Sequence, residues 1–125
     1  MPVRTVVANN NVKDDEGRVA VERGPIVYCA EAADNQNEPV LRAVIGKQPT
    51  FDVVDNYKID NTETKGAPAF AVKAITTQAQ MLEDGANGVS VKNQKLTLIP
   101  YYAWNHRGAD QMNVWFVQSL KMLDK

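Results

Sequence analysis

Short runs in which polar and apolar residues alternate recur along the chain, and turn-forming residues separate them. Val3 to Ala8 is rich in valine and ends at three consecutive asparagines, and Arg18 to Arg23 alternates valine with alanine and glutamate. Ile26 to Ala30 is almost entirely apolar, which is typical of a central strand covered on both faces. Because alternation with period two places successive side chains on opposite faces of a strand, this pattern restricts the chain to β structure.

The same pattern predicts about eight or nine short strands, with a turn signal every ~8–12 residues. Phe51 to Val54 and Tyr57 to Ile59 are two of them, and Leu96 to Trp104 is the longest. Ala74 to Leu82 is the most ambiguous stretch, because it is rich in residues that favour helices. We predict an all-β fold, an antiparallel β-sandwich of jelly-roll type, with less than about 15% helix.

Two further details of this prediction concern the last third of the chain. Lys92 to Lys95 is predicted as a turn before the longest strand. Met112 to Leu120 is predicted as the last strand, with Met112, Val114 and Phe116 on one face.

Length and charge limit the classes of protein to which the chain can belong. Its 125 residues correspond to one domain, so we expect a single domain over residues 1–125. Fourteen basic and fifteen acidic residues give a net charge of -1, which argues against nucleic acid or an anionic membrane surface as a partner. The apolar runs, such as Leu98 to Trp104, are too short to cross a bilayer.

One cysteine and one histidine restrict the available chemistry. A single cysteine excludes an internal disulfide and a cysteine-rich zinc site. Cys29 lies in an apolar run, which favours a buried, inert thiol over a nucleophile. His106 lies in an Asn-His-Arg-Gly turn, where an exposed turn residue is a simpler interpretation than a general base or a metal ligand. No motif singles out the pair of carboxylates that a glycosidase needs, so we predict no catalytic residue, no metal site and no cofactor.

Aromatic residues gather near the end of the chain. Tyr101, Tyr102 and Trp104 lie in the longest predicted strand, and Trp115 and Phe116 lie in the next. Alternation would place Tyr102 and Trp104 on one face, together with the apolar residues of the same strand. Exposed rings there would form a platform for a sugar, whereas buried rings would belong to the core or to a contact with another domain. We expect the second arrangement, with the Trp104 ring largely buried.

Two stretches are similar to a known family when they are read whole. Arg23 to Cys29 reads Arg-Gly-Pro-Ile-Val-Tyr-Cys, and Pro100 to Gly108 reads Pro-Tyr-Tyr-Ala-Trp-Asn-His-Arg-Gly. With their flanking strands they resemble the C-terminal β-sandwich region of β-L-arabinofuranosidase-type glycoside hydrolases, family 127 and its relatives. The resemblance frames nearly the whole chain, although residues 34–90 carry no motif and His106 stands where asparagine is more often expected.

The resemblance implies that the chain is a C-terminal fragment of a larger bacterial glycoside hydrolase. Family members have a preceding helical-barrel catalytic domain, in which a zinc-associated cysteine nucleophile and glutamates perform the chemistry. None of those motifs occurs here, and Cys29 belongs to the strand motif rather than to that nucleophile. A non-catalytic accessory domain is therefore implied, with the catalytic domain and a second copy of the parent as partners.

Two other functions are alternatives to this accessory domain. One is a carbohydrate-binding module that holds a polysaccharide through exposed aromatic rings, and the other is a free-standing enzyme, which the missing catalytic motifs disfavour. Arg23 and Arg107 are suited to capping loop carbonyls or pairing with carboxylates. The residues expected to contact another domain or a sugar are Tyr102, Trp104, His106 and Arg107.

Overall fold

Antiparallel strands make up most of the described chain, and the predicted all-β class is confirmed. The computed structural model describes residues 2–7, 18–35, 43–59, 70–85, 88–103 and 112–118. Within them the only helices are two three-residue 3-10 turns, and neither could cross a membrane. The elements are β1 (Val3–Val7), β2 (Val19–Arg23), β3 (Ile26–Glu31), η2 (Ala32–Asp34), β4 (Phe51–Ile59), β5 (Phe70–Gly85), β6 (Gly88–Pro100), η3 (Tyr101–Ala103) and β7 (Met112–Asn113).

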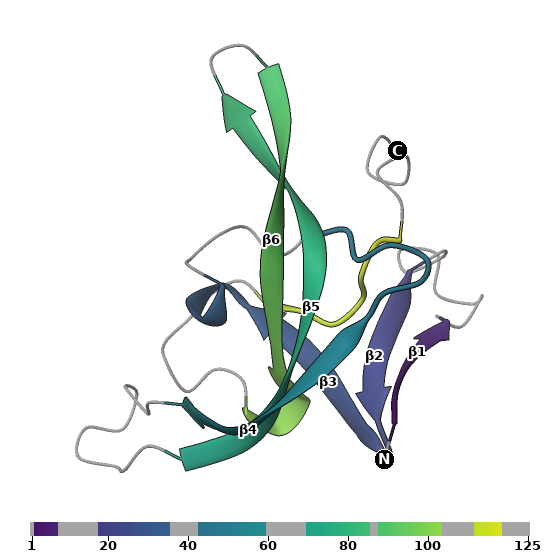
Figure 1. The fold of residues 1–125 in the computed structure, drawn as a ribbon, viewed down its shortest axis with the longest axis vertical. Helices are drawn as coiled ribbons and strands as arrows, with labels where there is room; N and C mark the ends of the chain where they lie inside the picture. Colours follow the sequence, from purple (N-terminus) through teal and green to yellow (C-terminus); the bar gives the residue numbers. More distant parts are fainter. Residues whose placement is uncertain are drawn as a thin grey trace.

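These strands form one seven-stranded sheet in the order β1-β2-β3-β6-β5-β4, with β7 paired to β3 (Figure 1). β5 and β6 form a long hairpin whose paired residues run from Ile75 and Leu98 to Gly85 and Gly88. The ambiguous Ala74 to Leu82 stretch is therefore strand, because pairing along its full length overrides its helix propensity. The turn predicted at Lys92 to Lys95 is wrong, since these residues pair with Met81 to Gln78 inside the hairpin.

Short bridging segments connect the two halves of this sheet. Residues 43–45 pair with Gln80 of β5 through N–O distances of 2.9 and 3.0 Å, and they also pair with Val117. Phe116 in turn pairs with Val19 of β2 through N–O distances of 2.7 and 2.9 Å. Backbone hydrogen bonds thus run from β2 through β3 and β6 to β5. From β5 they return to β2 through residues 43–45 and 116–117. The sheet wraps around its core in this way.

Alternation along the strands divides the buried side chains between two clusters. On β3, Tyr28 and Ala30 enter the first cluster and Cys29 enters the second, and on β6 the same division separates Leu98 from Ile99. The first cluster lies inside the ring of strands. Its buried members are Val19, Val21, Tyr28, Ala30, Ala43, Ile45, Ile75, Ala79, Met81, Leu96, Leu98 and Phe116. The predicted burial of Cys29 is confirmed, because none of its surface is exposed.

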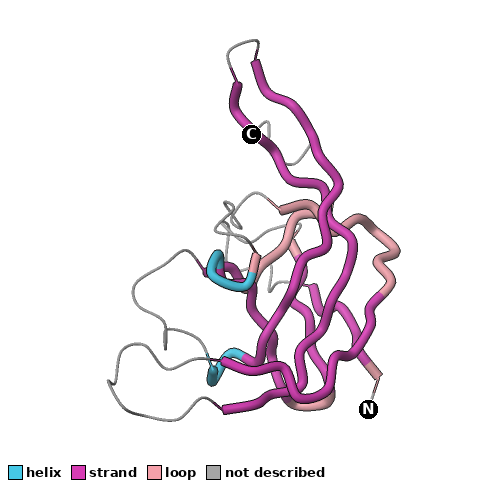
Figure 2. The backbone as a smooth tube through the Cα atoms, turned by 60° about the vertical axis from the view of Figure 1, so that its left-hand side comes forward, coloured by secondary structure: helices cyan, strands magenta, loops and turns pink. Residues whose placement is uncertain are grey.

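The β5–β6 hairpin extends well beyond this core. Figures 1 and 2 both show its distal half projecting from the rest of the described chain. The pairing between Gln80 and Val44 is the last described backbone pairing of β5 with a third segment, and beyond the buried Met81 the two strands pair only with each other. We call residues 82–85 and 88–91 the hairpin arm.

The strand predicted from Leu96 to Trp104 starts and ends earlier than expected, because β6 spans Gly88–Pro100. β6 ends at Pro100, whose ring nitrogen has no hydrogen to donate, and Tyr101–Ala103 forms the 3-10 turn η3. Tyr102 therefore does not share the buried face of Leu98, and 67% of its surface is exposed. Trp104 lies outside the described residues, so its predicted burial stays a prediction.

Candidate functional site

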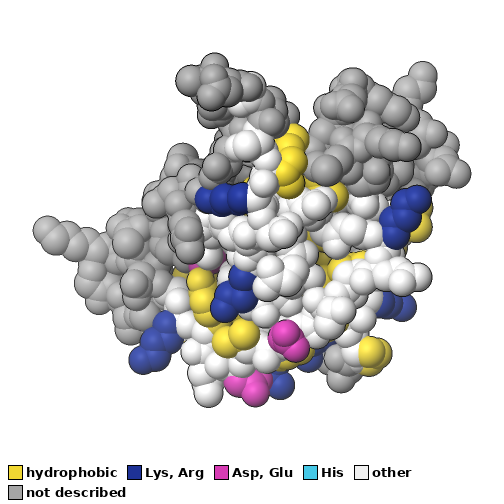
Figure 3. All heavy atoms as spheres, turned by 45° about the horizontal axis from the view of Figure 1, so that its top comes forward, with side chains coloured by type: hydrophobic (Ala, Val, Ile, Leu, Met, Phe, Trp, Pro, Cys, Tyr) yellow, Lys and Arg dark blue, Asp and Glu magenta, His cyan; other side chains and the backbone are white. Residues whose placement is uncertain are grey.

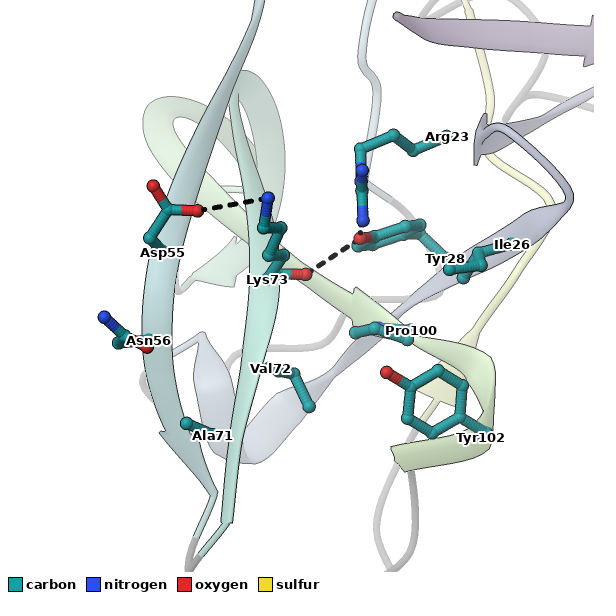
Figure 4. A pocket seen from close by; sticks show the side chains of 10 residues that line it. All are labelled: Arg23, Ile26, Tyr28, Asp55, Asn56, Ala71, Val72, Lys73, Pro100 and Tyr102. Carbon is teal, nitrogen blue, oxygen red and sulfur yellow. Dashed lines mark hydrogen bonds and ion pairs between the residues drawn. The ribbon is translucent and has the colours of Figure 1, made fainter. Parts of the chain in front are cut away.

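The two family-like motifs meet at one open cavity of about 540 Å³. The first motif contributes Arg23, Ile26 and Tyr28, and the second contributes Pro100 and Tyr102. Tyr28 and Pro100 are paired across β3 and β6, so the sheet itself brings the motifs together. Strands β4 and β5 supply the other wall, and Figure 4 labels all ten lining residues. Its volume lies within the range of about 300–1,000 Å³ typical of small-molecule sites.

The hydroxyl group of Tyr28 links three strands at the floor of this cavity. It donates a hydrogen bond to the backbone carbonyl of Lys73 on β5 (2.8 Å) and accepts one from the Nε of Arg23 on β2 (3.3 Å). The Tyr28 side chain is fully buried, and both contacts satisfy its hydroxyl. Gly24, with a φ of 61°, forms the tight turn that returns β2 into β3 and places Arg23 beside Tyr28.

The charged groups of the cavity are Arg23, Lys73 and Asp55. The pKa of Arg23 lies above its usual value, first because of its hydrogen bond to Tyr28 and the charge interaction with it. Desolvation lowers this pKa, and weaker charge interactions with Tyr102 and Asp55 raise it. Lys73 Nζ lies 3.7 Å from Asp55 Oδ1, and both side chains are more than half exposed, so this ion pair contributes little to stability.

A β-bulge in β4 directs two polar residues toward the cavity. The register of β4 against β5 shifts between Val54 and Tyr57, and Asp55 and Asn56 lie within this shift. Asn56 has a φ of 60°, a left-handed conformation that asparagine tolerates better than most residues. Asp55 and Asn56 together oppose one residue of β5, and this one extra residue bends the strand and re-aims side chains, as bulges beside binding sites commonly do. The sequence pattern predicts two separate strands here, Phe51 to Val54 and Tyr57 to Ile59, whereas the structure has one strand with a bulge between them.

The structure places one of the four predicted contact residues at this cavity. Tyr102 lines it and is largely exposed, whereas Trp104, His106 and Arg107 lie outside the described residues. Arg23 pairs with a hydroxyl rather than with the carbonyl or carboxylate that we expected. The remaining polar members, Tyr28, Asp55, Asn56 and Lys73, were not predicted as site residues.

The described residues contain no group of three or more His, Cys, Asp or Glu side chains that could hold a metal ion. What they do bring together is an exposed tyrosine ring, a fixed guanidinium and several polar side chains around an open cavity. Such a set of groups is suited to recognising a polar molecule.

Comparison with known proteins decides the family. Residues 3–117 match the model of the glycoside hydrolase family 127 C-terminal domain. The chain belongs to this family. The match begins at the first residue of β1 and ends at Val117, so it includes every described strand.

The relatives of this family 127 domain are much longer proteins. A non-reducing end β-L-arabinofuranosidase of Bifidobacterium longum subsp. longum is 32% identical over 118 residues, which are 92% of this chain and 18% of the relative. The solved structure of a family 127 β-arabinofuranosidase is 43% identical with a TM-score of 0.80, and the alignment covers 97% of this chain and 18% of that one. A family 127 β-L-arabinofuranosidase from Geobacillus stearothermophilus T6 is 27% identical with a TM-score of 0.74, over 95% of this chain and 18% of that one. The chain thus spans about a fifth of the length of these relatives.

Removing one oxygen from the cavity floor tests how this family 127 domain is held together. We expect Tyr28→Phe to lower the free energy of unfolding by about 1–3 kcal/mol, because the Lys73 carbonyl loses its donor and Arg23 Nε loses its acceptor. Urea denaturation measures the loss. Tyr102→Phe is the matched control, since the Tyr102 side chain lines the same cavity but is 67% exposed, so water can satisfy the groups around its hydroxyl. A Tyr28→Phe variant as stable as the parent chain would contradict the assigned role of this hydroxyl.

Proposed function

We propose that the chain is a non-catalytic accessory domain of a β-L-arabinofuranosidase-like glycoside hydrolase. In this proposal it packs against the helical-barrel catalytic domain of its parent and supports dimerisation of that parent, and it needs no metal or cofactor of its own. The observation that carries the proposal is the match over residues 3–117 to a C-terminal domain of family 127. Alignment with this chain covers only 18% of each arabinofuranosidase relative, so the greater part of those enzymes lies outside the aligned domain.

The hairpin arm is the contact surface that we assign to this packing. A two-stranded hairpin is marginally stable in water by itself, and a third layer or a partner is normally needed to support it. Val91, which pairs with Leu82 in the arm, is 46% exposed, and hydrophobic side chains also reach the surface at separate places in Figure 3. The projection of the hairpin beyond the core is therefore the ground for this assignment, and Val91 is the exposed apolar side chain by which it can be tested.

The packing is tested by expressing this chain and the remainder of its parent as separate polypeptides. We expect them to co-elute as a one-to-one complex, and we expect Val91→Glu to weaken that complex at least about tenfold, because a carboxylate would have to be buried at the contact. Val7→Glu is the matched control: Val7 is 70% exposed on the edge strand β1, which β2 and β3 separate from β6 in the sheet order. Isothermal titration calorimetry measures both affinities, and sedimentation of the intact parent carrying Val91→Glu reports on the dimer.

Activity of the separate polypeptides tests the non-catalytic part of the proposal. The chain alone is expected to release no nitrophenol from p-nitrophenyl β-L-arabinofuranoside. Turnover by the chain alone would refute a non-catalytic role, and two polypeptides that fail to associate would refute the packing. Equal loss of affinity with Val7→Glu and Val91→Glu would show that the arm is not the contact.

A further inference from the structure

We infer that the open cavity between the two motifs binds a sugar residue, with one face of the sugar ring on Tyr102 and its oxygen atoms against the Arg23 guanidinium. This inference goes beyond the proposed packing role, and it concerns a surface separate from the hairpin arm. It rests on the shape of the cavity, on the exposed ring and on the polar groups around it.

The cavity can hold one sugar residue of a longer chain. Its volume of about 540 Å³ exceeds that of a single sugar ring, and it is open to solvent, so neighbouring residues of an oligosaccharide can extend outward. In Figure 4 the Arg23 guanidinium and the Tyr102 ring stand at opposite ends of the cavity, with Lys73 and Asp55 along its side.

Tyr102 has the exposure that a stacking platform requires. Its side chain belongs to η3 rather than to β6, and 67% of its surface is accessible although it lies only two residues after Pro100, the buried end of the strand. An aromatic face packs against the C–H groups on one side of a sugar ring, and its hydroxyl offers an additional hydrogen bond. Tyr28 in the same cavity is fully buried, so Tyr102 is the tyrosine of the lining whose ring a ligand can reach.

Arg23 supplies donors for the oxygen atoms of the ligand. Its Nε is held by the Tyr28 hydroxyl at 3.3 Å, which orients the guanidinium and leaves its two Nη groups without a partner among the described residues. Planar guanidinium groups of this kind bind two adjacent oxygen atoms at once, either vicinal hydroxyls or the two oxygens of a carboxylate. Asp55 and Asn56, re-aimed by the bulge in β4, add acceptors and donors for the remaining hydroxyls.

The charge of the lining admits both neutral and acidic sugars. Lys73 lies 3.7 Å from the Asp55 carboxylate, so Arg23 is the cation left without a carboxylate partner in the described part of the cavity. A neutral sugar would accept hydrogen bonds from the Arg23 guanidinium through hydroxyl oxygens, and a uronic acid would accept them through its carboxylate.

The site is tested by titrating the isotopically labelled chain with arabinotriose, cellotriose and trigalacturonic acid while its amide and Arg23 Nε–H resonances are recorded. We expect saturable shifts around the cavity with at least one probe, and a dissociation constant on the order of 1 mM, because one ring and a few hydrogen bonds contribute. Binding by trigalacturonic acid alone would assign the Arg23 contact to a carboxylate, and binding of a neutral probe would assign it to hydroxyls.

Two pairs of matched variants locate the binding. Tyr102→Ala should weaken it at least about tenfold, whereas Tyr101→Ala, at an adjacent exposed tyrosine that does not line the cavity, should change it less than about twofold. Asp55→Ala should weaken it, and Asp52→Ala, on the same strand but outside the cavity, should not. The inference is overturned if no probe gives saturable shifts, or if the Tyr102→Ala chain, with its amide spectrum intact, binds as tightly as the unmodified chain.

Discussion

Replacing Asn35 with alanine is expected to lower the free energy of unfolding of this domain by about 3–5 kcal/mol, because three buried backbone groups lose their partners together. Asn35 is 2% exposed and follows directly on η2. Its Nδ2 donates to the carbonyl of Glu31 (2.8 Å) and to the carbonyl of Thr97 (3.0 Å). Its Oδ1 accepts from the amide of Thr97 (2.7 Å).

The geometry of β3 explains why this carboxamide matters so much. β3 pairs with β6 only at Tyr28 and Cys29, and from Ala30 onward it pairs with β7 instead. Continued pairing would have placed Glu31 opposite Thr97. The Asn35 side chain takes that place, because it offers Thr97 one donor and one acceptor as a neighbouring strand would. Loss of this side chain leaves polar groups of β6 unpaired in a buried environment.

Guanidinium denaturation of Asn35→Ala measures the loss, and two further variants make the result specific. Asn35→Asp should be nearly as damaging, since a carboxylate cannot donate to the two carbonyls that Nδ2 serves. Asn93→Ala removes an exposed carboxamide from β6, the strand that carries Thr97, and should change the free energy of unfolding by less than about 1 kcal/mol. An Asn35→Ala chain with an unchanged midpoint would mean that water replaces the carboxamide.

The strands near the N-terminus could be predicted from the sequence because local pattern and turn chemistry agree there. Alternation marked β1 and β2, and Gly24-Pro25 marked the turn into β3. The bulge in β4 was not predictable, because its position depends on how β4 pairs with β5 and not on a local signal. The turn expected at Lys92 to Lys95 failed for a similar reason, since pairing with β5 extends a polar stretch that would not hold a strand alone.

The predicted last strand shows how one side chain can interrupt a regular pattern. We predicted Met112, Val114 and Phe116 on one face, yet Met112 and Val114 pack on the second core cluster while Phe116 enters the first. The Oδ1 of Asn113 accepts a hydrogen bond from the Trp115 amide at 3.1 Å, which forms a local turn. The chain bends there, and the alternation restarts in a different register.

The candidate site was predictable only in part, because its residues come together through tertiary contacts. Both motifs could be recognised in the sequence, but the pairing of Tyr28 with Pro100 that joins them lies between residues far apart in the chain. Tyr102 was singled out for its ring, while its exposure follows from the end of β6 at Pro100. Asp55 and Lys73 carry no motif, and only the bulge and the pairing of β4 with β5 bring them to the cavity.

Phe116→Ala is expected to lower the free energy of unfolding by about 3–5 kcal/mol, as large-to-small changes at fully buried aromatic residues commonly do. None of the Phe116 surface is exposed, and its ring lies in the first core cluster. Its backbone also pairs with Val19 at 2.7 and 2.9 Å, so the residue fills the core at the point where the ring of strands closes. The cavity left by alanine would therefore lie beside the closing segment 116–117, where few other strands constrain the backbone.

Chemical denaturation, monitored by intrinsic fluorescence, measures this loss of stability. Two substitutions of graded size separate the contribution of core packing from that of the backbone pairing with Val19. Phe116→Leu keeps most of the volume and should cost less than half as much as alanine if packing dominates. Val54→Ala, at a partly exposed position on β4, is the control and should cost less than about 1 kcal/mol. Hydrogen exchange at the Val19 amide, which donates to Phe116, should accelerate in Phe116→Ala more than at amides in the middle of β5. Uniform acceleration across the sheet would instead mean that the ring of strands opens only through global unfolding.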